Sequence, residues 1–279
     1  MAALENMEKL SVCVEQVSLE VMELINYVAS KLGIDQNKVT IMDRSESFYY
    51  YALSQKPELF LYDVALFDYS GANMVSFTLH RNQNTSPQMI TIDVINHGEL
   101  PENRDERFDE IISNTFGNTL YSAVYLVGDG FDGEWMKVSL SRLCRGRKVF
   151  LGKNLYSKGA CFGAYIKDGK RDWPFIYIGD NDLKINLSIK ILDNNVMKFF
   201  TLIDAGESWY DAKGECEVIL DGEPELEFFI QRPESREAHT DVLELTDMPR
   251  RENRTSRLRI EARPISDVAV AITITDLGF

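Results

Sequence analysis

Residues 121–133 read YSAVYLVGDGFDG, and this stretch decides which fold the sequence predicts. Tyr121 to Val127 is a compact apolar run, typical of an interior strand with helices covering its sheet. A glycine-rich turn from Gly128 to Gly133 follows, and we expect a helix from Glu134 to Cys144 after it. A strand, a glycine turn and a helix in this order can bring an anion close to the backbone. The same spacing also fits an ordinary tight connection from strand to helix.

The sequence before this stretch alternates between strand and helix patterns. Apolar residues first alternate with polar ones, which indicates a strand, and then recur at helical spacing between Ser18, which suits an N-cap, and Gly33, which suits a C-terminal stop. The elements expected before residue 121 are a strand within 9–17, a helix at 18–33, a strand at 39–42, a helix at 46–53, a hairpin of strands 60–68 and 73–80, a strand at 89–95 and a helix at 102–116.

The character of the sequence changes after residue 168. Apolar residues from Leu183 to Ile191 alternate with polar ones, and Val268 to Ile274 repeats that pattern. Two further short runs, 217–220 and 225–230, flank a turn at 221–224. Short strands at this spacing, with almost no helical periodicity, predict an all-β antiparallel sandwich. We therefore expect an α/β domain at residues 1–168 and a β-sandwich domain at 169–279.

Length and charge limit the classes of protein to which the chain can belong. Its 279 residues exceed the roughly 100–200 residues of one domain, which agrees with two domains. The net charge of −14 argues against binding to nucleic acids or anionic membranes, because phosphate would be repelled. No stretch approaches the roughly 18 apolar residues of a membrane span, and residues 1–10 show no targeting pattern. These observations predict a soluble, cytoplasmic protein.

The cysteines and histidines give no pattern of a metal site. None of the four cysteines forms a Cys-x-x-Cys pair, and only three histidines are present to join them, so we expect reduced, structural thiols and no metal. Cys144 lies among arginines that would lower the pKa of a thiol. Its spacing from Leu140 on an apolar helix face favours instead a buried, inert side chain.

One segment departs from the acidic balance of the chain. Residues 135–167 contain no aspartate or glutamate and eight lysines and arginines. Two interpretations remain open: an anion or nucleotide site, or a solvated basic face paired with acidic neighbours. The basic patch that we expect to serve either role consists of Arg142, Arg145, Arg147, Lys148, Lys153 and Lys158.

The order of the expected elements resembles the second half of the actin, hexokinase and heat-shock chaperone ATPase superfamily. Five strings carry the resemblance, which covers residues 9–166: a strand and helix, a connecting helix, a phosphate hairpin, an adenosine motif and a closing helix of small residues. They are found, in this order, at 9–33, 44–53, 60–79, 121–133 and 159–164.

The resemblance implies that residues 1–168 are the second lobe of an actin-like ATPase fold, a mixed sheet with helices. It also suggests that the β-rich remainder is the counterpart of the substrate domain of the chaperones. The strings at 128–136 and 152–161 are similar to those of an uncharacterised bacterial group of chaperone-ATPase relatives.

The departures from the family pattern limit what chemistry the resemblance implies. The family's phosphate hairpin carries Asp-x-Gly-x-Gly-Thr, whereas residues 68–72 here read DYSGA. Asp68 is retained, but Ser70 replaces the first glycine and the final Gly-Thr is missing. The family's first lobe, with its own phosphate loop, has no counterpart before Lys9. Because phosphoryl transfer needs charge stabilisation from both sides of the phosphate, we expect no ATP turnover.

Two functions follow from these observations. The first is a non-catalytic or weakly nucleotide-binding relative of chaperone-type ATPases that acts as a protein-binding or assembly module. The alternative is a fragment or subunit of an active ATPase whose first lobe lies outside this chain. If ATP or ADP binds, binding should be weak and the amides of the helix starting near Glu134 should face the turn. The residues expected to contribute are Asp68, Gly71, Gly128, Asp129, Gly130 and Gly133, with the basic patch. An unrelated enzyme has little support, because the sequence contains no P-loop and no Gly-x-Ser-x-Gly motif.

Overall fold

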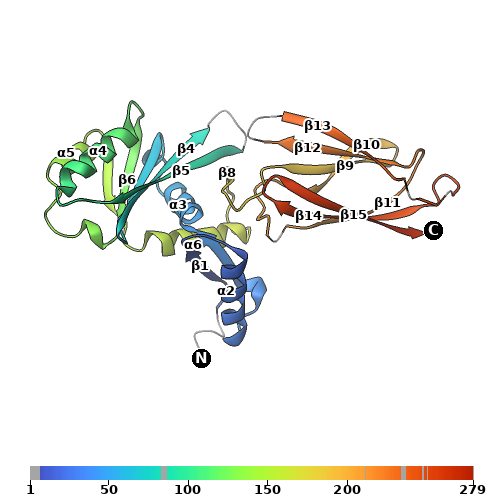
Figure 1. The fold of residues 1–279 in the computed structure, drawn as a ribbon, viewed down its shortest axis with the longest axis horizontal. Coiled ribbons are helices and arrows are strands. Elements are labelled where there is room, and N and C mark those ends of the chain that lie inside the picture. Colours follow the sequence, from blue (N-terminus) through green and yellow to red (C-terminus); the bar gives the residue numbers. More distant parts are fainter. Residues whose placement is uncertain are drawn as a thin grey trace. The chain divides into compact units, whose positions relative to one another are not determined.

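The computed structural model describes residues 7–82, 87–210, 212–233, 237–246, 248–249 and 251–278. The chain forms two compact units, Met1–Tyr177 and Ile178–Phe279. The first unit is mixed α/β and the second consists of antiparallel β-sheets (Figure 1). The units divide after Tyr177, beyond the boundary expected at residue 168. Strand β8 (Phe175–Tyr177) belongs to the first unit because it pairs in parallel with β5 (Gln88–Glu99).

The first unit begins with a β-α-β segment. Strand β1 (Leu10–Val14) pairs in parallel with β2 (Val39–Asp43), and helix α2 (Leu19–Lys31) connects them. The Ser18 hydroxyl accepts a hydrogen bond from the Val21 amide at 3.3 Å, which confirms the expected N-cap. These elements were predicted from the sequence and are confirmed.

Two helices pack closely together beside this segment. Helix α3 (Arg44–Leu53) contacts α6 (Leu155–Lys167) along much of its length. The close approach depends on small residues, since a Cβ atom at Gly159 would lie 2.0 Å from the Ser47 carbonyl oxygen. Both helices were expected, the first at 46–53 and the second, of small residues, at 159–164. Both are present, and they pack directly against each other.

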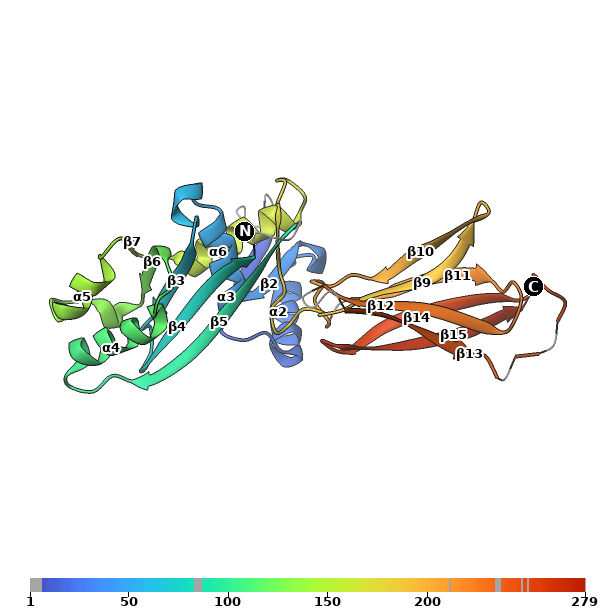
Figure 2. The same ribbon diagram turned by 90° about the horizontal axis from the view of Figure 1, so that it is seen from above.

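The core of the first unit is a six-stranded mixed sheet in the order β7-β6-β3-β4-β5-β8. Strand β6 (Tyr121–Val127) lies inside the sheet between β7 (Lys148–Leu151) and β3 (Asp63–Asp68), as its apolar sequence predicted. β3 forms the expected hairpin with β4 (Asn73–Asn82). Figure 2 shows β3, β4 and β5 side by side.

Successive side chains of β3 and β6 enter two different hydrophobic layers, as strand geometry requires. On one face, Leu66 packs with α3 and α6, including Phe48. On the other, Phe67 packs edge to face on Phe108 of α4 (Arg104–Phe116), with the ring centroids 5.2 Å apart. Figure 1 shows α4 and the short helix α5 (Val138–Leu143) on one side of the sheet and α3 on the other.

The helix expected at 134–144 is wrong in its first half. Residues 134–137 are irregular and α5 begins only at Val138. Trp135 explains the difference, because its ring stacks on Phe131 and its indole Nε1 donates a hydrogen bond to the Gly130 carbonyl at 3.0 Å. The segment must fold back to place this ring, and it cannot do so as a continuous helix. Strands β7 and β8 were not predicted.

The second unit contains a four-stranded sheet, β10-β9-β12-β13, and a three-stranded sheet, β11-β14-β15, both antiparallel. Runs 217–220 and 225–230 belong to different sheets, so the turn between them passes from one layer to the other. Strands β10, β13 and β14 were not predicted. The bounds are β9 (Asn186–Asp193), β10 (Val196–Ile203), β11 (Gly214–Ile219), β12 (Glu225–Arg232), β13 (Glu237–Glu244), β14 (Arg257–Ser266) and β15 (Ala269–Gly278).

The hydrophobic core of the second unit lies between its two sheets. Leu187 and Phe228 contribute from one sheet, and Leu258 and Ile260 contribute from the other. Across the part of the chain that the structure describes, no helix is both long and apolar enough to span a membrane.

Candidate functional site

The candidate site lies where β3 and β6 end, and Asp68 is its central residue. The Asp68 side chain is 2% exposed. It accepts hydrogen bonds from the Ser70 amide at 2.9 Å, from the Ser70 hydroxyl at 2.5 Å and from the Tyr156 hydroxyl at 2.6 Å. A buried carboxylate is costly unless it is paired and hydrogen-bonded, and these contacts meet that requirement.

Arg44 supplies the opposite charge to this carboxylate. It is the first residue of α3, and its Nη1 lies 3.4 Å from Asp68 Oδ2 and 3.6 Å from the exposed Glu15. Its guanidinium lies over the Tyr156 ring, 5.5 Å from the centroid. Burial raises the pKa of Tyr156, and the neighbouring Asp68 raises it further. The hydroxyl therefore remains a hydrogen-bond donor to Asp68 throughout the physiological range.

The glycine turn lies beside this cluster, and residues 69 and 70 fill the space that its glycines leave. The Gly130 amide donates to the Tyr69 carbonyl at 3.0 Å. A Cβ at Gly128 would lie 2.3 Å from the Ser70 nitrogen, and one at Gly130 would lie 2.2 Å from Tyr69 Cδ1. Gly128 also has a φ of 106°, which non-glycine residues rarely adopt. These two glycines are thus used for close packing inside the chain.

The remaining predicted residues of the turn and hairpin do not join the cluster. Gly71 and Gly133 have open space where a side chain would point, and Asp129 is exposed. The structure therefore brings Asp68, Gly128 and Gly130 together around residues 69 and 70, and it leaves the other three predicted residues at the surface.

The helix after the turn does not present free amides to a ligand. Its N-terminus is capped by Asp105, whose carboxylate accepts from the amides of Lys137 and Val138, both at 2.9 Å, and of Ser139 at 3.0 Å. Desolvation acts to raise the pKa of Asp105, but the bonds from the Ser139 hydroxyl and these amides outweigh it and hold the pKa well below its usual range. The expectation that amides near Glu134 face the turn is wrong, because α5 starts later and a carboxylate of the same chain occupies its end.

The predicted basic patch is distributed over several elements with separate partners. Arg142 makes a bidentate pair with Asp109, at 2.5 and 2.8 Å, and Lys148 lies 3.1 Å from Glu58. Arg147 lies over the Phe116 ring, 4.0 Å from the centroid. The interpretation as a basic face paired with acidic neighbours therefore holds for Arg142 and Lys148. Arg145, Lys148, Lys153 and Lys158 are the exposed members of the patch.

The expectation that Cys144 is buried is wrong. Cys144 is the C-cap of α5 and is exposed. Leu140, on the same side of the helix, is itself 41% exposed, so this side does not pack into the core. Among the residues that the structure describes, no group of three or more His, Cys, Asp and Glu side chains could hold a metal ion.

Sequence reasoning missed Arg44, Tyr156 and a separate titratable group at His80. The His80 ring lies between Asp63, 2.6 Å from Nδ1, and Asp93, 3.3 Å from Nε2. The hydrogen bond to Asp63 is the main cause of a raised His80 pKa. No local pattern marks these residues, because each acts through partners far away in the sequence. Only the position of Arg44 directly after a strand indicates a helix start near the sheet.

Comparisons with known proteins give family membership and no activity. No curated protein matches the chain. Residues 182–279 match a domain of unknown function, DUF8552. Residues 1–180 match the C-terminal model of a family of unknown function, DUF5716, and because this match covers more than half of the chain, the protein belongs to that family.

Proposed function

We propose that this protein is a non-catalytic relative of the chaperone-type actin-like ATPases and that it acts as a protein-binding or assembly module. The observation that carries the proposal is that residues of the chain itself fill the space where β3 and β6 end. In the resembled fold, this place would receive the phosphates of a nucleotide. Here Tyr69 and Ser70 lie against the glycine turn, and Arg44 and Tyr156 engage Asp68.

The chemistry of the cluster opposes nucleotide binding. A phosphate approaching Asp68 would have to displace the Ser70 and Tyr156 hydrogen bonds and leave a buried carboxylate unsatisfied. Arg44, the cation that faces Asp68, is already shared between Asp68 and Glu15. The amides of α5 are taken by Asp105. Nucleotide binding at this place should therefore be weak, and turnover absent.

The test compares nucleotide binding and hydrolysis in two aspartate variants. We expect the purified chain to hydrolyse MgATP at the background rate, and calorimetric titration with ADP to give little or no heat. Asp68→Asn tests the buried carboxylate, and Asp129→Asn is the matched control, since Asp129 is exposed. Circular dichroism verifies that each variant is folded. MgATP turnover that disappears in Asp68→Asn and persists in Asp129→Asn would refute the proposal.

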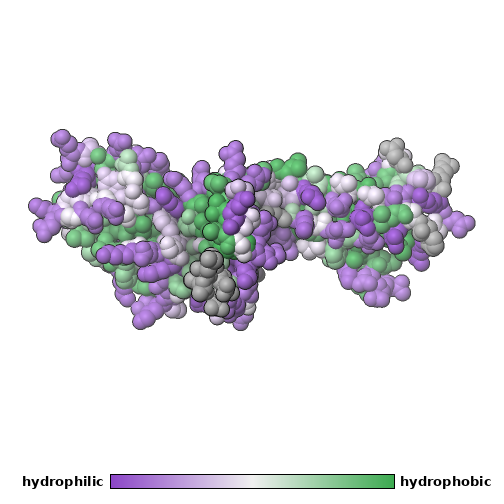
Figure 3. Space-filling view, turned by 90° about the horizontal axis from the view of Figure 1, so that it is seen from below, coloured by the Kyte–Doolittle hydropathy of each residue, from purple (hydrophilic) through white to green (hydrophobic). Residues whose placement is uncertain are grey.

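A second candidate, one part of a larger assembly, is favoured by the β1–β2 segment. Parallel sheets normally have both faces covered, yet this one has two strands and most of their residues are half-exposed. In α2 only Ala29 is buried. Figure 3 shows hydrophobic surface at the place of α2. The exposed apolar residues of α2 and its C-cap are Leu19, Leu24, Tyr27, Val28 and Leu32.

The coding sequence upstream of Met1 tests this second candidate. If it encodes strands and an Asp-x-Gly motif, co-expression should give a complex that Leu24→Asp disrupts. Glu23→Lys, a charge change at a polar and exposed neighbour in the same helix, should leave that complex intact. A complex that survives Leu24→Asp would remove the apolar side of α2 from the interface.

A further inference from the structure

The second unit has an open side, because its two sheets have unequal numbers of strands. The sheet β10-β9-β12-β13 has four strands and the sheet β11-β14-β15 has three. At one end of the sandwich, β10 lies near β11. At the other end, the smaller sheet stops at β15, and a groove separates β15 from β13. No strand of the described chain pairs with the free edge of β15.

The inward-facing side chains become more exposed along both sheets toward this open side. In β14 the inward residues Ile260 and Ala262 are fully buried, whereas their partners in β15, Ile274 and Ile272, are only partly buried. Across the sandwich, Leu226 of β12 is 7% exposed and its neighbour in β13, Leu243, is 42% exposed. The core therefore stops one strand short of closure in the smaller sheet.

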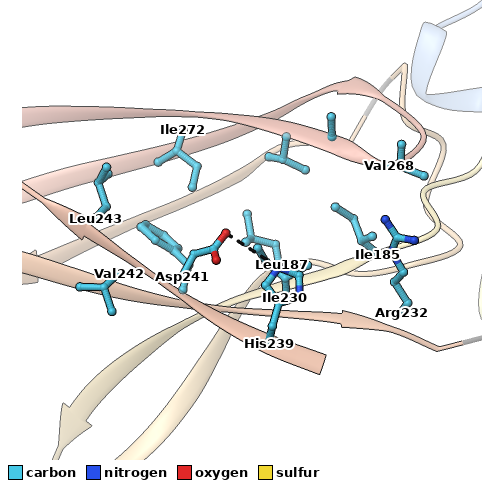
Figure 4. Close-up of a pocket in the computed structure, with 13 residues that line it drawn as sticks. Ile185, Leu187, Ile230, Arg232, His239, Asp241, Val242, Leu243, Val268 and Ile272 are labelled. Atoms are coloured by element: carbon cyan, nitrogen blue, oxygen red, sulfur yellow. Dashed lines mark ion pairs between the residues drawn. The ribbon is translucent and has the colours of Figure 1, made fainter. Parts of the chain in front are cut away.

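A groove of about 620 Å³ occupies this place, with a volume in the range of ligand pockets. Aliphatic side chains from β9, β12, β13 and β15 line it. Figure 4 shows Leu243 near Ile272 at one end and Arg232 beside Ile185 and Val268 at the other.

The backbone edge beside the groove is unprotected. An edge strand offers unpaired N–H and C=O groups, and natural proteins usually guard such edges with charges or proline. The other three edges of this unit carry charge: Lys198 in β10, glutamates in β11, and Glu237, Asp241 and Glu244 in β13. In β15 the charged residue, Asp276, lies near the far end of the strand and pairs with Arg251 at 2.7 Å. Residues 269–275, which include the part of β15 that lines the groove, read AVAITIT, with no charge and no proline.

Charge distinguishes the two ends of the groove. Arg232 is exposed and makes no ion pair with any residue in the described ranges. Farther along β13, Asp241 lies 3.8 Å from His239, and its carboxylate lines the groove. A bound segment should therefore carry a carboxylate at the Arg232 end and no acidic residue over Asp241.

We propose that this groove binds an extended segment of a partner protein, which adds to β15 as a fourth strand and lies under β13. The proposal rests on the proposed function as a protein-binding module and names the site and the partner chemistry. The segment has β-branched residues at alternate positions, because every second side chain faces the aliphatic groove. It runs antiparallel to β15, as the strands of this sheet do, so its C-terminal end and its carboxylate lie beside Arg232.

The experiment measures peptide binding to the full chain by fluorescence anisotropy. The probe is a labelled peptide of about nine residues, the length of a strand, in which valine and isoleucine alternate with threonine before a free C-terminal carboxylate. A peptide of the same composition with the alternation scrambled is its control. We expect saturable binding of the alternating peptide only, with amide shifts in the NMR spectrum confined to β15, β13 and their groove-facing neighbours.

Two pairs of variants locate the site. Leu243→Glu places a charge in the groove and should raise the Kd at least about tenfold, whereas Thr240→Glu, on the outer face of the same strand, should change it by less than about twofold. Arg232→Gln should weaken binding of the carboxylate peptide several-fold but leave its C-terminal amide form unchanged. Arg263→Gln, at an exposed position of β14 outside the groove, should leave both peptides unaffected.

Three results would overturn the inference: no saturable binding of the alternating peptide, equal binding of the scrambled peptide, or equal effects of Leu243→Glu and Thr240→Glu. If the peptide does not bind and ATP hydrolysis stays at background, the groove is not a peptide site, but the non-catalytic assignment stands. If ATP turnover depends on Asp68 and the peptide binds specifically in the groove, the non-catalytic assignment is refuted and the peptide site stands.

Discussion

Replacing Tyr156 by phenylalanine tests whether the Asp68 cluster holds the first unit together. The substitution keeps the ring and removes only the hydroxyl that donates to Asp68 at 2.6 Å. Asp68 Oδ2 then keeps only Arg44 at 3.4 Å, although the carboxylate remains buried. Losing a hydrogen bond to a buried charged group costs about 1.5–3 kcal/mol. We therefore expect the free energy of unfolding of the first unit to fall by about 2 kcal/mol.

The assay is urea denaturation followed by the far-ultraviolet circular dichroism of helices. All helices in the described residues lie in the first unit, so this signal reports on that unit separately from the β-rich one. With a slope of about 1–2 kcal/mol per molar urea, the midpoint should fall by about 1–2 M. Tyr165→Phe is the matched control, since Tyr165 lies on the same helix and is 51% exposed. An unchanged midpoint for Tyr156→Phe, or an equal change for Tyr165→Phe, would show that the hydroxyl does not stabilise the unit.

The other predictions use the same denaturation assay. Gly130→Ala should destabilise the first unit by about 1–3 kcal/mol, because the new Cβ would meet Tyr69. Gly71→Ala should be nearly neutral, because Gly71 has open space around it. Equal midpoints for the two variants would contradict the packing role of Gly130. Asp105→Ala should cost about 1 kcal/mol as a lost helix cap. Because the folded-state pKa of Asp105 is lowered, its contribution is present above the unfolded pKa and is lost as the pH falls through the folded one; a deficit that stays constant down to acidic pH would contradict this. His80 has a raised pKa, so its contribution is fully present below about pH 6.5 and is lost as the pH rises through the folded value. His80→Gln should therefore lower stability most in mildly acidic buffer, and a deficit that grows toward alkaline pH would reverse the assignment.

Helices and strands with a clear local pattern of apolar residues were predictable from the sequence. Helix α2 has a capping serine and apolar residues at helical spacing, and β6 is an uninterrupted apolar run, so each was identified from its own residues. Strand β13 has neither signal. It reads EAHTDVLE and all of its residues are exposed, since it lies over the open side of the sandwich. A strand that buries little has no need of an alternating apolar pattern, and such a pattern is what sequence reasoning detects.

The ion-pair and hydrogen-bond partners of the charged residues could not be predicted from the sequence, for a different reason. Asp68 was identified as a site residue, but its partners Arg44 and Tyr156 come from helices placed long before and long after it in the chain. Ion pairs across such separations depend on how the elements pack, and no periodicity records them. The basic stretch illustrates the same limit, because its composition suggested one patch while the fold gave Arg142 and Lys148 separate acidic partners.

The glycine turn shows what a sequence pattern can and cannot specify. Glycines at 128 and 130 indicate that something approaches the backbone closely, and this inference is correct. The pattern does not identify what approaches, because a phosphate and a neighbouring peptide make the same demand: that no Cβ be present. In this structure the approaching groups are Tyr69 and the Ser70 amide. Ser70, which stands where the resembled ATPases have a glycine, donates hydrogen bonds to Asp68 from both its amide and its hydroxyl. The same residue thus removes a glycine that the phosphate pattern requires and supplies an internal hydrogen-bond partner for Asp68.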